Sequence, residues 1–378
     1  MFDRSKETKL TEYLDSLLDK GIPSVDCIVY SDHKQIYRHM NGTVDAEGTR
    51  RVAKDQRYLM FSMTKVQTMT AVMQLVEQGK LSMDSEVGDF LPAYKNLKVS
   101  DEKGERDLKE PLRLWHLLSM QSGLDYDLNR PGILRVLKEK GQKAGTREIV
   151  DSFTESPLKF EPGTHFLYSL SHDVVAAVIE VVSGMSFGEY LNENLWKPLH
   201  MSDTFFAKPD NEGLERLARQ FIVSDKGIVP MEQSCNYQLT ENYESGGAGL
   251  ISCTEDYAKL ADTLACGGES AEGIRILKPE TVNIIKTNLL CDTSLYEVAH
   301  NMGRRGYGYG CGMQILMHPE EIGSTAPAGV FGWDGAAGSA IQMDTASRLS
   351  FVYVQHVRNC GMSYDVIHPT IRDIVFGR

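Results

Sequence analysis

The spacing of apolar residues changes several times over the first eighty residues, and each change predicts a different element. Apolar positions three or four residues apart indicate an amphipathic helix, whereas short β-type runs bounded by polar turns indicate strands. In chain order the pattern predicts a helix, a two-stranded hairpin, a third strand and a long helix: 5–20, 25–30 with 35–39, 57–61, and from 66 to Gly79. Glycine supplies the conformational freedom that commonly ends a helix.

The rest of the chain divides into a helical middle and a strand-rich end. The middle, about 96–244, has helix signals and charged loops, and its clearest helix is expected over 172–195. From about 245, glycine-rich turns separate short β-type runs that precede a last amphipathic helix: 306–317, 329–333, 339–344, 350–357 and the helix 363–376.

This order of elements predicts an α/β fold of the α+β sandwich type. Strand signals at both chain ends favour one antiparallel sheet flanked by helices, and the helices between them favour an insertion. We therefore expect a discontinuous α/β domain from 1–95 and 245–378. A mainly helical insertion over 96–244 is expected to close a cleft against it.

Composition narrows the class of protein. Hydrophobic residues make up 42% of the 378 residues and charged residues 24%, which is ordinary for a globular protein with a buried core. The net charge of −12 disfavours nucleic acid and anionic membranes as partners.

The longest apolar run, 174–179, is far shorter than a membrane span. The charged N-terminus lacks the apolar core of a secretory signal, and seven scattered cysteines indicate reduced, mostly buried thiols. We therefore expect a cytoplasmic protein.

Two serine motifs compete for the role of nucleophile. Residues Gly184–Gly188 match G-x-S-x-G, but a nucleophile elbow needs a strand before Ser186, and the preceding residues predict a helix. We therefore interpret this motif as a helix-to-helix connection. The second motif, S-x-x-K, begins at four positions: Ser31, Ser62, Ser100 and Ser156.

Only Ser62 of these four begins a long amphipathic helix. Residues three apart lie on one helical face, so the amine of Lys65 can reach the hydroxyl of Ser62. The helix N-terminus also brings backbone N–H groups and the positive end of the helix dipole close to this hydroxyl, which favours a developing oxyanion. Ser62 and Lys65 are therefore the candidate nucleophile and base.

Four further segments follow Ser62 and Lys65 along the chain. They are His116–Leu124, Tyr168-Ser169, the glycine run Ser245–Leu250, and Phe331–Gly338. With them, the chain from about 25 to 360 resembles the serine β-lactamase and penicillin-binding-protein superfamily. It looks closest to the class C β-lactamase-like branch, which includes esterases, D-amino-acid peptidases and acyltransferases. The superfamily's motifs S-x-x-K, Y-x-N and K-T-G (W-x-G in esterase-like members) correspond to Ser62 with Lys65, Tyr168, and Trp333 with Gly335.

The resemblance implies a two-step reaction through an acyl-enzyme on Ser62. A lysine at its usual pKa of about 10.4 is protonated at neutral pH, so burial must lower the pKa of Lys65 toward roughly 7–8 if it is to act as a base. Tyr168 is expected to share the proton and return it to the leaving group. The backbone N–H groups of Ser62 and Ala336 are expected to form the oxyanion hole.

Two positions depart from the superfamily's pattern. The asparagine expected two residues after Tyr168 is Leu170, which removes a hydrogen bond to an acylamide side chain. The cation of K-T-G is replaced by Trp333, and Asp334 follows it. A carboxylate there disfavours substrates that carry a carboxylate beside the scissile bond. We expect Leu170, Trp333, Asp334 and Gly335 to contact the substrate, and neutral or cationic esters with an apolar acyl part to be preferred.

The expected function is therefore that of a serine hydrolase acting on a small-molecule ester or amide. A true β-lactamase or a D,D- or D-amino-acid peptidase is the alternative among enzymes, and a catalytically inactive binding module is the alternative of another class. The ten histidines are scattered without the spacing of metal ligands, so neither a metal nor another cofactor is expected. The oligomeric state stays open.

Overall fold

Strands from both ends of the chain form one seven-stranded sheet in the computed structural model, which describes residues 2–206, 214–232 and 237–377. The sheet is antiparallel, and its strand order is β10-β11-β12-β13-β14-β1-β2. In the same order the strands are Tyr307–Tyr309, Gln314–Leu316, Phe331–Gly335, Ser339–Asp344, Leu349–Val354, Ser24–Ser31 and Lys34–Gly42. The pairing of β1 with β14 joins the two chain ends, which confirms the predicted fold class.

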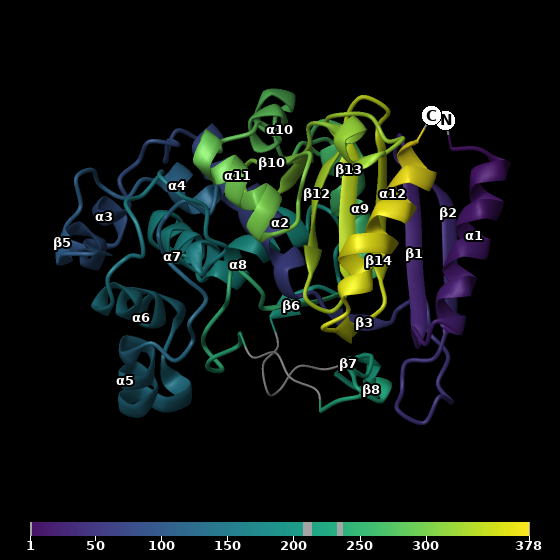
Figure 1. Ribbon diagram of the computed structural model, residues 1–378, viewed down its shortest axis with the longest axis horizontal. Helices are drawn as coiled ribbons and strands as arrows, with labels where there is room; N and C mark the ends of the chain where they lie inside the picture. Colours follow the sequence, from purple (N-terminus) through teal and green to yellow (C-terminus); the bar gives the residue numbers. More distant parts are fainter. Residues whose placement is uncertain (1, 207–213, 233–236, 378) are drawn as a thin grey trace.

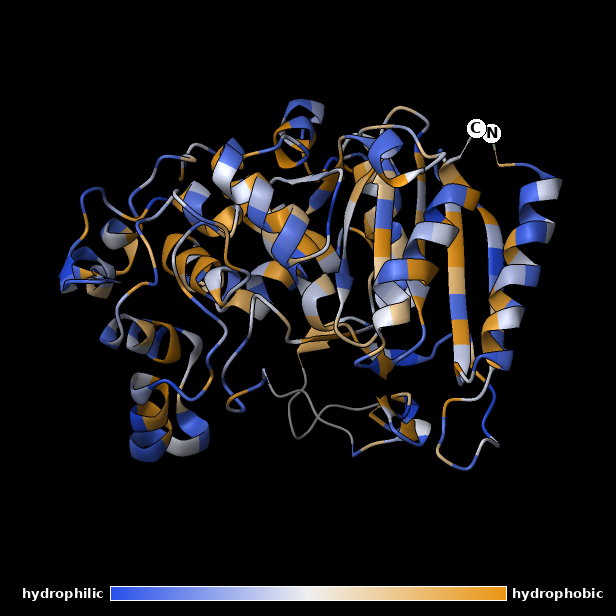
Figure 2. Cartoon of the chain, viewed as in Figure 1, coloured by the Kyte–Doolittle hydropathy of each residue, from blue (hydrophilic) through white to orange (hydrophobic). Residues whose placement is uncertain are grey.

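Helices cover both faces of this sheet (Figure 1). One face carries α1 (Arg4–Asp19) and α12 (His368–Phe376), which a π-helical turn over Ser363–Ile367 precedes. The other face carries α2 (Thr64–Glu77) and α9 (Thr254–Ala265). Alternate residues of β1 enter the two cores, as the period of a strand requires. Figure 2 accordingly shows apolar strands at the centre of the sheet and helices of mixed hydropathy outside them.

A second group of helices lies beside the sheet, at the left of Figure 1. It holds α3 to α8: Val87–Phe90, Leu114–Leu118, Pro131–Lys140, Thr146–Asp151, Ser171–Ser183 and Phe187–Leu191. The short hairpin of β4 (Lys98–Asp101) and β5 (Gly104–Asp107) lies in the same part. Helix α7 packs on α2, so the two parts share one hydrophobic core. Helices α10 (Pro279–Ile285) and α11 (Asp292–Asn301) precede β10.

The last part of the predicted insertion returns to the sheet-bearing part of the molecule. Strand β6 (Phe205–Phe206) pairs with β9 (Leu250–Cys253), which also pairs with β3 (Arg57–Leu59). Strand β7 (Phe221–Ser224) pairs with β8 (Gly227–Pro230) and, in parallel, with β15 (Val357–Arg358). The division of the chain at 95/96 and 244/245 stays a prediction.

The helix expected over 172–195 is in fact two helices. Helix α7 ends at Ser183, where Gly184 adopts φ 74° in the left-handed region. Helix α8 then begins with Ser186 as its N-cap, and the side chain of Glu189 completes a capping box. The prediction of one helix was wrong because this cap starts a new helix. The interpretation of Gly184–Gly188 as a helix-to-helix connection is confirmed.

Two further expectations concern membranes and thiols. Among the described residues no single helix has the length and apolar character to span a membrane, although α7 with Phe187–Trp196, bent by 76°, passes that test as a pair. Of the described cysteines, Cys291 is exposed and the others are buried and free: Cys27, Cys253, Cys266, Cys311 and Cys360. Cys235 lies outside the described residues.

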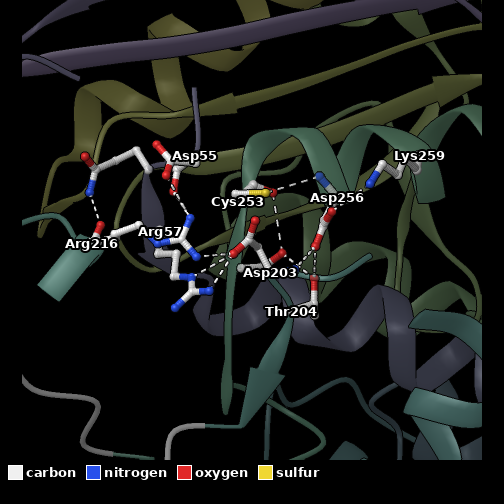
Figure 3. A network of polar contacts seen from close by, with 10 residues as sticks. Asp55, Arg57, Asp203, Thr204, Arg216, Cys253, Asp256 and Lys259 are labelled. Atoms are coloured by element: carbon white, nitrogen blue, oxygen red, sulfur yellow. Dashed lines mark hydrogen bonds and ion pairs between the residues drawn. The ribbon is translucent and has the colours of Figure 1, made fainter. Parts of the chain in front are cut away.

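A polar network anchors β3, the strand that leads to Ser62 (Figure 3). The buried guanidinium of Arg57 donates to one carboxylate oxygen of Asp203, from Nε at 3.0 Å and from Nη2 at 2.5 Å. Arg216 donates to the same oxygen and, at its other end, to Asp55 at 2.9 Å. The backbone N–H of Asp203 donates to Asp256 of α9 at 2.7 Å. Asp203 therefore ties β3 to the helix behind it.

The network predicts unequal effects for two of its carboxylates. Asp203→Ala removes the counter-charge of the buried Arg57 and should lower the free energy of unfolding by about 2–4 kcal/mol. Asp55→Ala breaks only an exposed ion pair and should lower it by less than about 1 kcal/mol. Urea denaturation of both variants measures the difference, and equal losses would contradict this account of the network.

Candidate active site

Ser62 lies where β3 turns into α2, on the wall of a cavity of about 820 Å³. A single 3₁₀ turn, Phe61–Met63, precedes the helix, and Phe61 adopts the unusual φ of 47°. The backbone N–H of Met60 donates to the carbonyl of Leu250 at 2.9 Å, which fixes the start of the turn. Ser62 itself is half-buried, so its hydroxyl can meet a ligand in the cavity.

Lys65 lies one helical turn further on and is fully buried. Its Nζ donates to the hydroxyl of Ser62 at 3.3 Å, to the hydroxyl of Tyr126 at 2.9 Å, and to the carbonyl of Gly247 at 2.7 Å. Burial lowers the pKa of Lys65 to about 7, although the charges of Asp173 and Asp334 act in the opposite direction. A substantial fraction of this amine is therefore neutral, and able to accept a proton, at neutral pH.

Tyr168 faces the same pair from the other side of the cavity. Its ring centroid lies 4.8 Å from Lys65 Nζ, and its hydroxyl accepts a hydrogen bond from the indole N–H of Trp333 at 3.0 Å. Burial raises the pKa of the phenol well above its ordinary value, although hydrogen bonds with Ser62 and Trp333 oppose that shift. Tyr168 is therefore a neutral phenol in the free protein, which can donate a proton but is a poor initial base.

The turn after β12 approaches the start of the 3₁₀ turn closely. A Cβ on Gly335 would lie 2.4 Å from the carbonyl oxygen of Met60, so only glycine permits this approach. Ala336, the next residue, lines the cavity together with Ser62. Trp333 is buried, and its ring packs against those of Tyr168 and Tyr309 at centroid distances of 5.5 and 5.0 Å.

The structure gives Asp334 a partner that the sequence did not show, and it places Leu170 outside the cavity. The carboxylate of Asp334 does line the cavity, but Arg304 Nη2 donates to it at 2.5 Å, so it is not the uncompensated charge that we expected. Arg304 lies thirty residues away in the chain, and no local pattern links the two. Leu170 is the N-cap residue of α7, its side chain lies in the hydrophobic core, and it is not among the described residues that line the cavity.

The sequence did not point to Tyr126 or Asp173, which both act on the amine of Lys65. Tyr126 contacts the amine directly, but nothing in its sequence neighbourhood distinguishes it from other tyrosines. Asp173 did have a signal, because it is an acidic residue in the apolar first turns of the helix that contains it. The sequence shows Ser245–Leu250 only as a glycine run. In the structure, the carbonyl oxygen of Gly247 in this run accepts a hydrogen bond from Lys65.

Asp173 is a fully buried carboxylate whose charge acts on this amine. Its Oδ1 accepts hydrogen bonds from Tyr243 at 2.7 Å and from Ser245 at 2.6 Å. A Cβ on Gly247 would lie 2.8 Å from Asp173 Oδ2 and 3.3 Å from Lys65 Nζ, so both groups face the same point. The negative charge raises the pKa of Lys65 and so offsets part of the effect of burial.

Among the described residues, one group of side chains, outside the catalytic cavity, has potential metal-ligand atoms close together. Ligand atoms of Asp32, His33 and Cys266 lie within 4.8 Å of one another. The guanidinium of Arg348 already contacts two of them, with Nε 2.6 Å from Asp32 and Nη2 3.2 Å from His33. A bound cation would meet this positive charge, and the absence of a metal cofactor stays a prediction.

The model of the Beta-lactamase family matches residues 7–373. The chain belongs to the β-lactamase family. One relative is Esterase EstB of Burkholderia gladioli, which is 26% identical to this chain. The aligned region covers 96% of this chain and 93% of the esterase. Acyltransferase calJ of Penicillium decumbens is 29% identical over 73% of this chain and 70% of its own.

A solved structure extends the agreement to the fold. EstCE1, a hydrolase with promiscuous acyltransferase activity, superposes with a TM-score of 0.83 at 24% identity, over 99% of each chain. At that identity the likeness shows the fold. The family and its esterase relative identify this chain as a serine hydrolase, which supports the expected enzyme over the inactive binding module.

The charge of the buried Asp173, which acts on the amine of Lys65, predicts a shift in the pH dependence of hydrolysis. In the unmodified enzyme, kcat/KM should rise as the pH passes about 7, because Lys65 loses its proton there. Asp173→Asn removes the attraction that favours the ammonium, so the pKa of Lys65 falls and the rise should move to lower pH. Profiles of kcat/KM against pH for a p-nitrophenyl ester measure the shift. Asp127→Asn, at an exposed carboxylate, should leave the profile in place, and an unmoved profile in Asp173→Asn would contradict the prediction.

Proposed function

We propose that the protein hydrolyses small neutral esters through an acyl-enzyme formed on Ser62. The observation that carries this proposal is the position of Lys65, which is fully buried with its amine 3.3 Å from the hydroxyl of Ser62. A serine hydroxyl is a weak nucleophile unless a base removes its proton. Lys65, with a pKa of about 7, is that base.

The reaction begins with attack of Ser62 Oγ on the substrate carbonyl. Lys65 takes the hydroxyl proton as the new C–O bond forms, and the carbonyl oxygen becomes an oxyanion. The backbone N–H groups of Ser62 and Ala336 stabilise this oxyanion, each by about 3–4 kcal/mol in the transition state. The proton passes through the phenol of Tyr168 to the leaving alcohol as the original C–O bond breaks. Water then attacks the acyl-enzyme with the same base and returns the free serine.

The shape and charge of the cavity favour neutral substrates. Trp333 stands where the superfamily's K-T-G motif has a cation, and the pair of Asp334 with Arg304 has no net charge. Aromatic rings of Tyr126, Tyr168 and Tyr237 line the wall near Ser62. An apolar acyl group can pack on these rings, whereas a carboxylate beside the scissile bond finds no cation at position 333. Esters are the substrate class that the esterase relative supports.

A second candidate reaction is transfer of the acyl group to an acceptor other than water. The similarity to Acyltransferase calJ supports it, and the cavity of about 820 Å³ that Ser62 lines has room for an acceptor larger than water. Hydrolysis and transfer share the acyl-enzyme on Ser62 and differ only in the last step. Product analysis with and without an added alcohol separates them.

The assignment of the nucleophile predicts different effects for two serines. Ser62→Ala should reduce hydrolysis of p-nitrophenyl butyrate by at least about a thousandfold, because the covalent route is lost. Ser186→Ala is the matched control, since Ser186 only caps α8, and its activity should stay close to normal. Mass spectrometry of the enzyme quenched during turnover should locate the added acyl group on the peptide that contains Ser62. Comparable losses in both folded variants would contradict the assignment.

The neutral cavity predicts weak activity on β-lactams, and this test separates the esterase from a β-lactamase or D,D-peptidase. We expect kcat/KM for nitrocefin to be at least about a hundredfold below that for the best neutral ester, a ratio that corresponds to about 2.7 kcal/mol. Replacement of one ion pair and one hydrogen bond is enough to produce it. Steady-state kinetics with both substrates measure the ratio, and equal efficiencies would support the β-lactamase instead.

A further inference from the structure

Arg304 presents unused hydrogen-bond donors to the catalytic cavity. Its side chain is only 14% exposed and lines the cavity that contains Ser62. Nη2 donates to Asp334, while Nε and Nη1 make no hydrogen bond to any residue in the ranges that the structure describes. A guanidinium has five N–H donors. Neither Nε nor Nη1 of Arg304 is fully enclosed by protein, so an acceptor that enters the cavity can bind them.

The surroundings hold Arg304 close to the end of β12, where it pairs with Asp334. Its backbone N–H donates to the carbonyl of Val298 at 3.1 Å, and its guanidinium lies 5.8 Å from the ring centroid of Tyr364. The hydroxyl of Tyr364 donates to the carbonyl of Gly335 at 3.0 Å. Gly335 directly precedes Ala336, the proposed oxyanion donor. Tyr364 therefore links Arg304 to the turn that contains Ala336.

The other two arginines of the cavity differ from Arg304. Arg372 donates to its neighbour Asp373 at 2.8 Å and to the hydroxyl of Tyr307. Arg305 is 71% exposed and pairs with Glu321 at 3.3 Å. Arg304 is therefore a largely buried arginine of this cavity with two nitrogens that have no partner among the described residues, whereas Arg372 has one such nitrogen.

We propose that Arg304 determines specificity by binding a second, uncharged oxygen of the substrate, such as a ketone, ether or additional ester carbonyl. This inference rests on the proposed hydrolysis at Ser62 and adds a subsite to it. Because Asp334 already balances the charge of Arg304, a neutral acceptor completes the guanidinium's hydrogen bonds without adding charge. A carboxylate in the same place would leave one uncompensated negative charge in a largely buried site.

Three p-nitrophenyl esters of similar acyl length test this subsite. The pentanoate has no second acceptor, the 4-oxopentanoate has a ketone, and the hemisuccinate has a carboxylate at the matching position. All three release the same phenol, so a difference in kcat/KM reports the acyl group, after subtraction of the uncatalysed rate. We expect the 4-oxopentanoate to exceed each of the other two by about tenfold. Butyl acetate and 2-methoxyethyl acetate extend the comparison to an acceptor on the alcohol side.

Variants then connect the preference to Arg304. Arg304→Met should reduce the ratio of 4-oxopentanoate to pentanoate, or of the methoxyethyl to the butyl ester, by about tenfold. Arg304→Lys keeps the positive charge beside Asp334 but loses the planar fork, so it should lower the same ratio even if Arg304→Met fails to fold. Asp334→Asn frees the positive charge of Arg304 and should shift the preference toward the hemisuccinate. Arg275→Met, at an exposed arginine that pairs with Glu269 and does not line this cavity, is the matched control and should leave the ratios unchanged.

The outcomes separate this inference from the proposed function. An Arg304-dependent preference in either ester series supports the subsite and shows whether the acyl or the alcohol side occupies it. Equal efficiencies within both series, or ratios that Arg304→Met and Arg304→Lys leave intact, overturn the subsite while hydrolysis at Ser62 stands. Full activity in Ser62→Ala would instead overturn the proposed function.

Discussion

The burial of one amine governs this active site. Lys65 has no exposure to solvent, and water would otherwise keep its ammonium charged. Its pKa lies at about 7 in the folded protein, against 10.5 for a free lysine. Between these values the unfolded chain binds more protons than the folded one, so stability rises with pH across that window. Below it the folded state carries the full penalty of the buried charge. The site that can activate Ser62 is thus also a site that opposes folding.

Glycines from distant parts of the chain make this arrangement possible. Gly247 leaves the space in which Lys65, Tyr126 and Asp173 converge, and a single methyl group there would meet all three. Gly335 allows β12 to approach the carbonyl of Met60, which brings the proposed oxyanion donor to the nucleophile. The S-x-x-K spacing occurs four times in this chain, and of these four serines, all of them in the described residues, only Ser62 lines the cavity, together with Tyr126 and Tyr168.

Features set by local sequence were predictable, and features set by distant contacts were not. The hairpin, the helix after Ser62 and the sheet built from both ends follow from apolar spacing and turn residues. The span 172–195 was predicted as one helix because its apolar stripe continues on both sides of Gly184, although the motif Gly184–Gly188 was correctly interpreted as a helix-to-helix connection. Asp334 was correctly considered a charged residue near the site, but its partner Arg304 comes from a separate loop.

The same distinction holds for the residues around the base. Ser62 and Lys65 are linked by helical spacing, which a sequence displays directly. Tyr126 reaches the amine from another loop, and Leu170 points into the core although its motif position suggested a substrate contact. These placements depend on how α7 packs against α2, which no single segment encodes.

The pKa of Lys65 is the quantity that tests this account most directly. Protein labelled with ¹³C at the lysine side chains can be titrated by NMR, with Lys65→Met used to assign the resonance of interest. The account predicts one lysine signal that titrates near pH 7 and is missing from Lys65→Met. A Lys65 signal that titrates near 10.5 would contradict the central claim, because the amine would then be protonated when Ser62 must lose its proton.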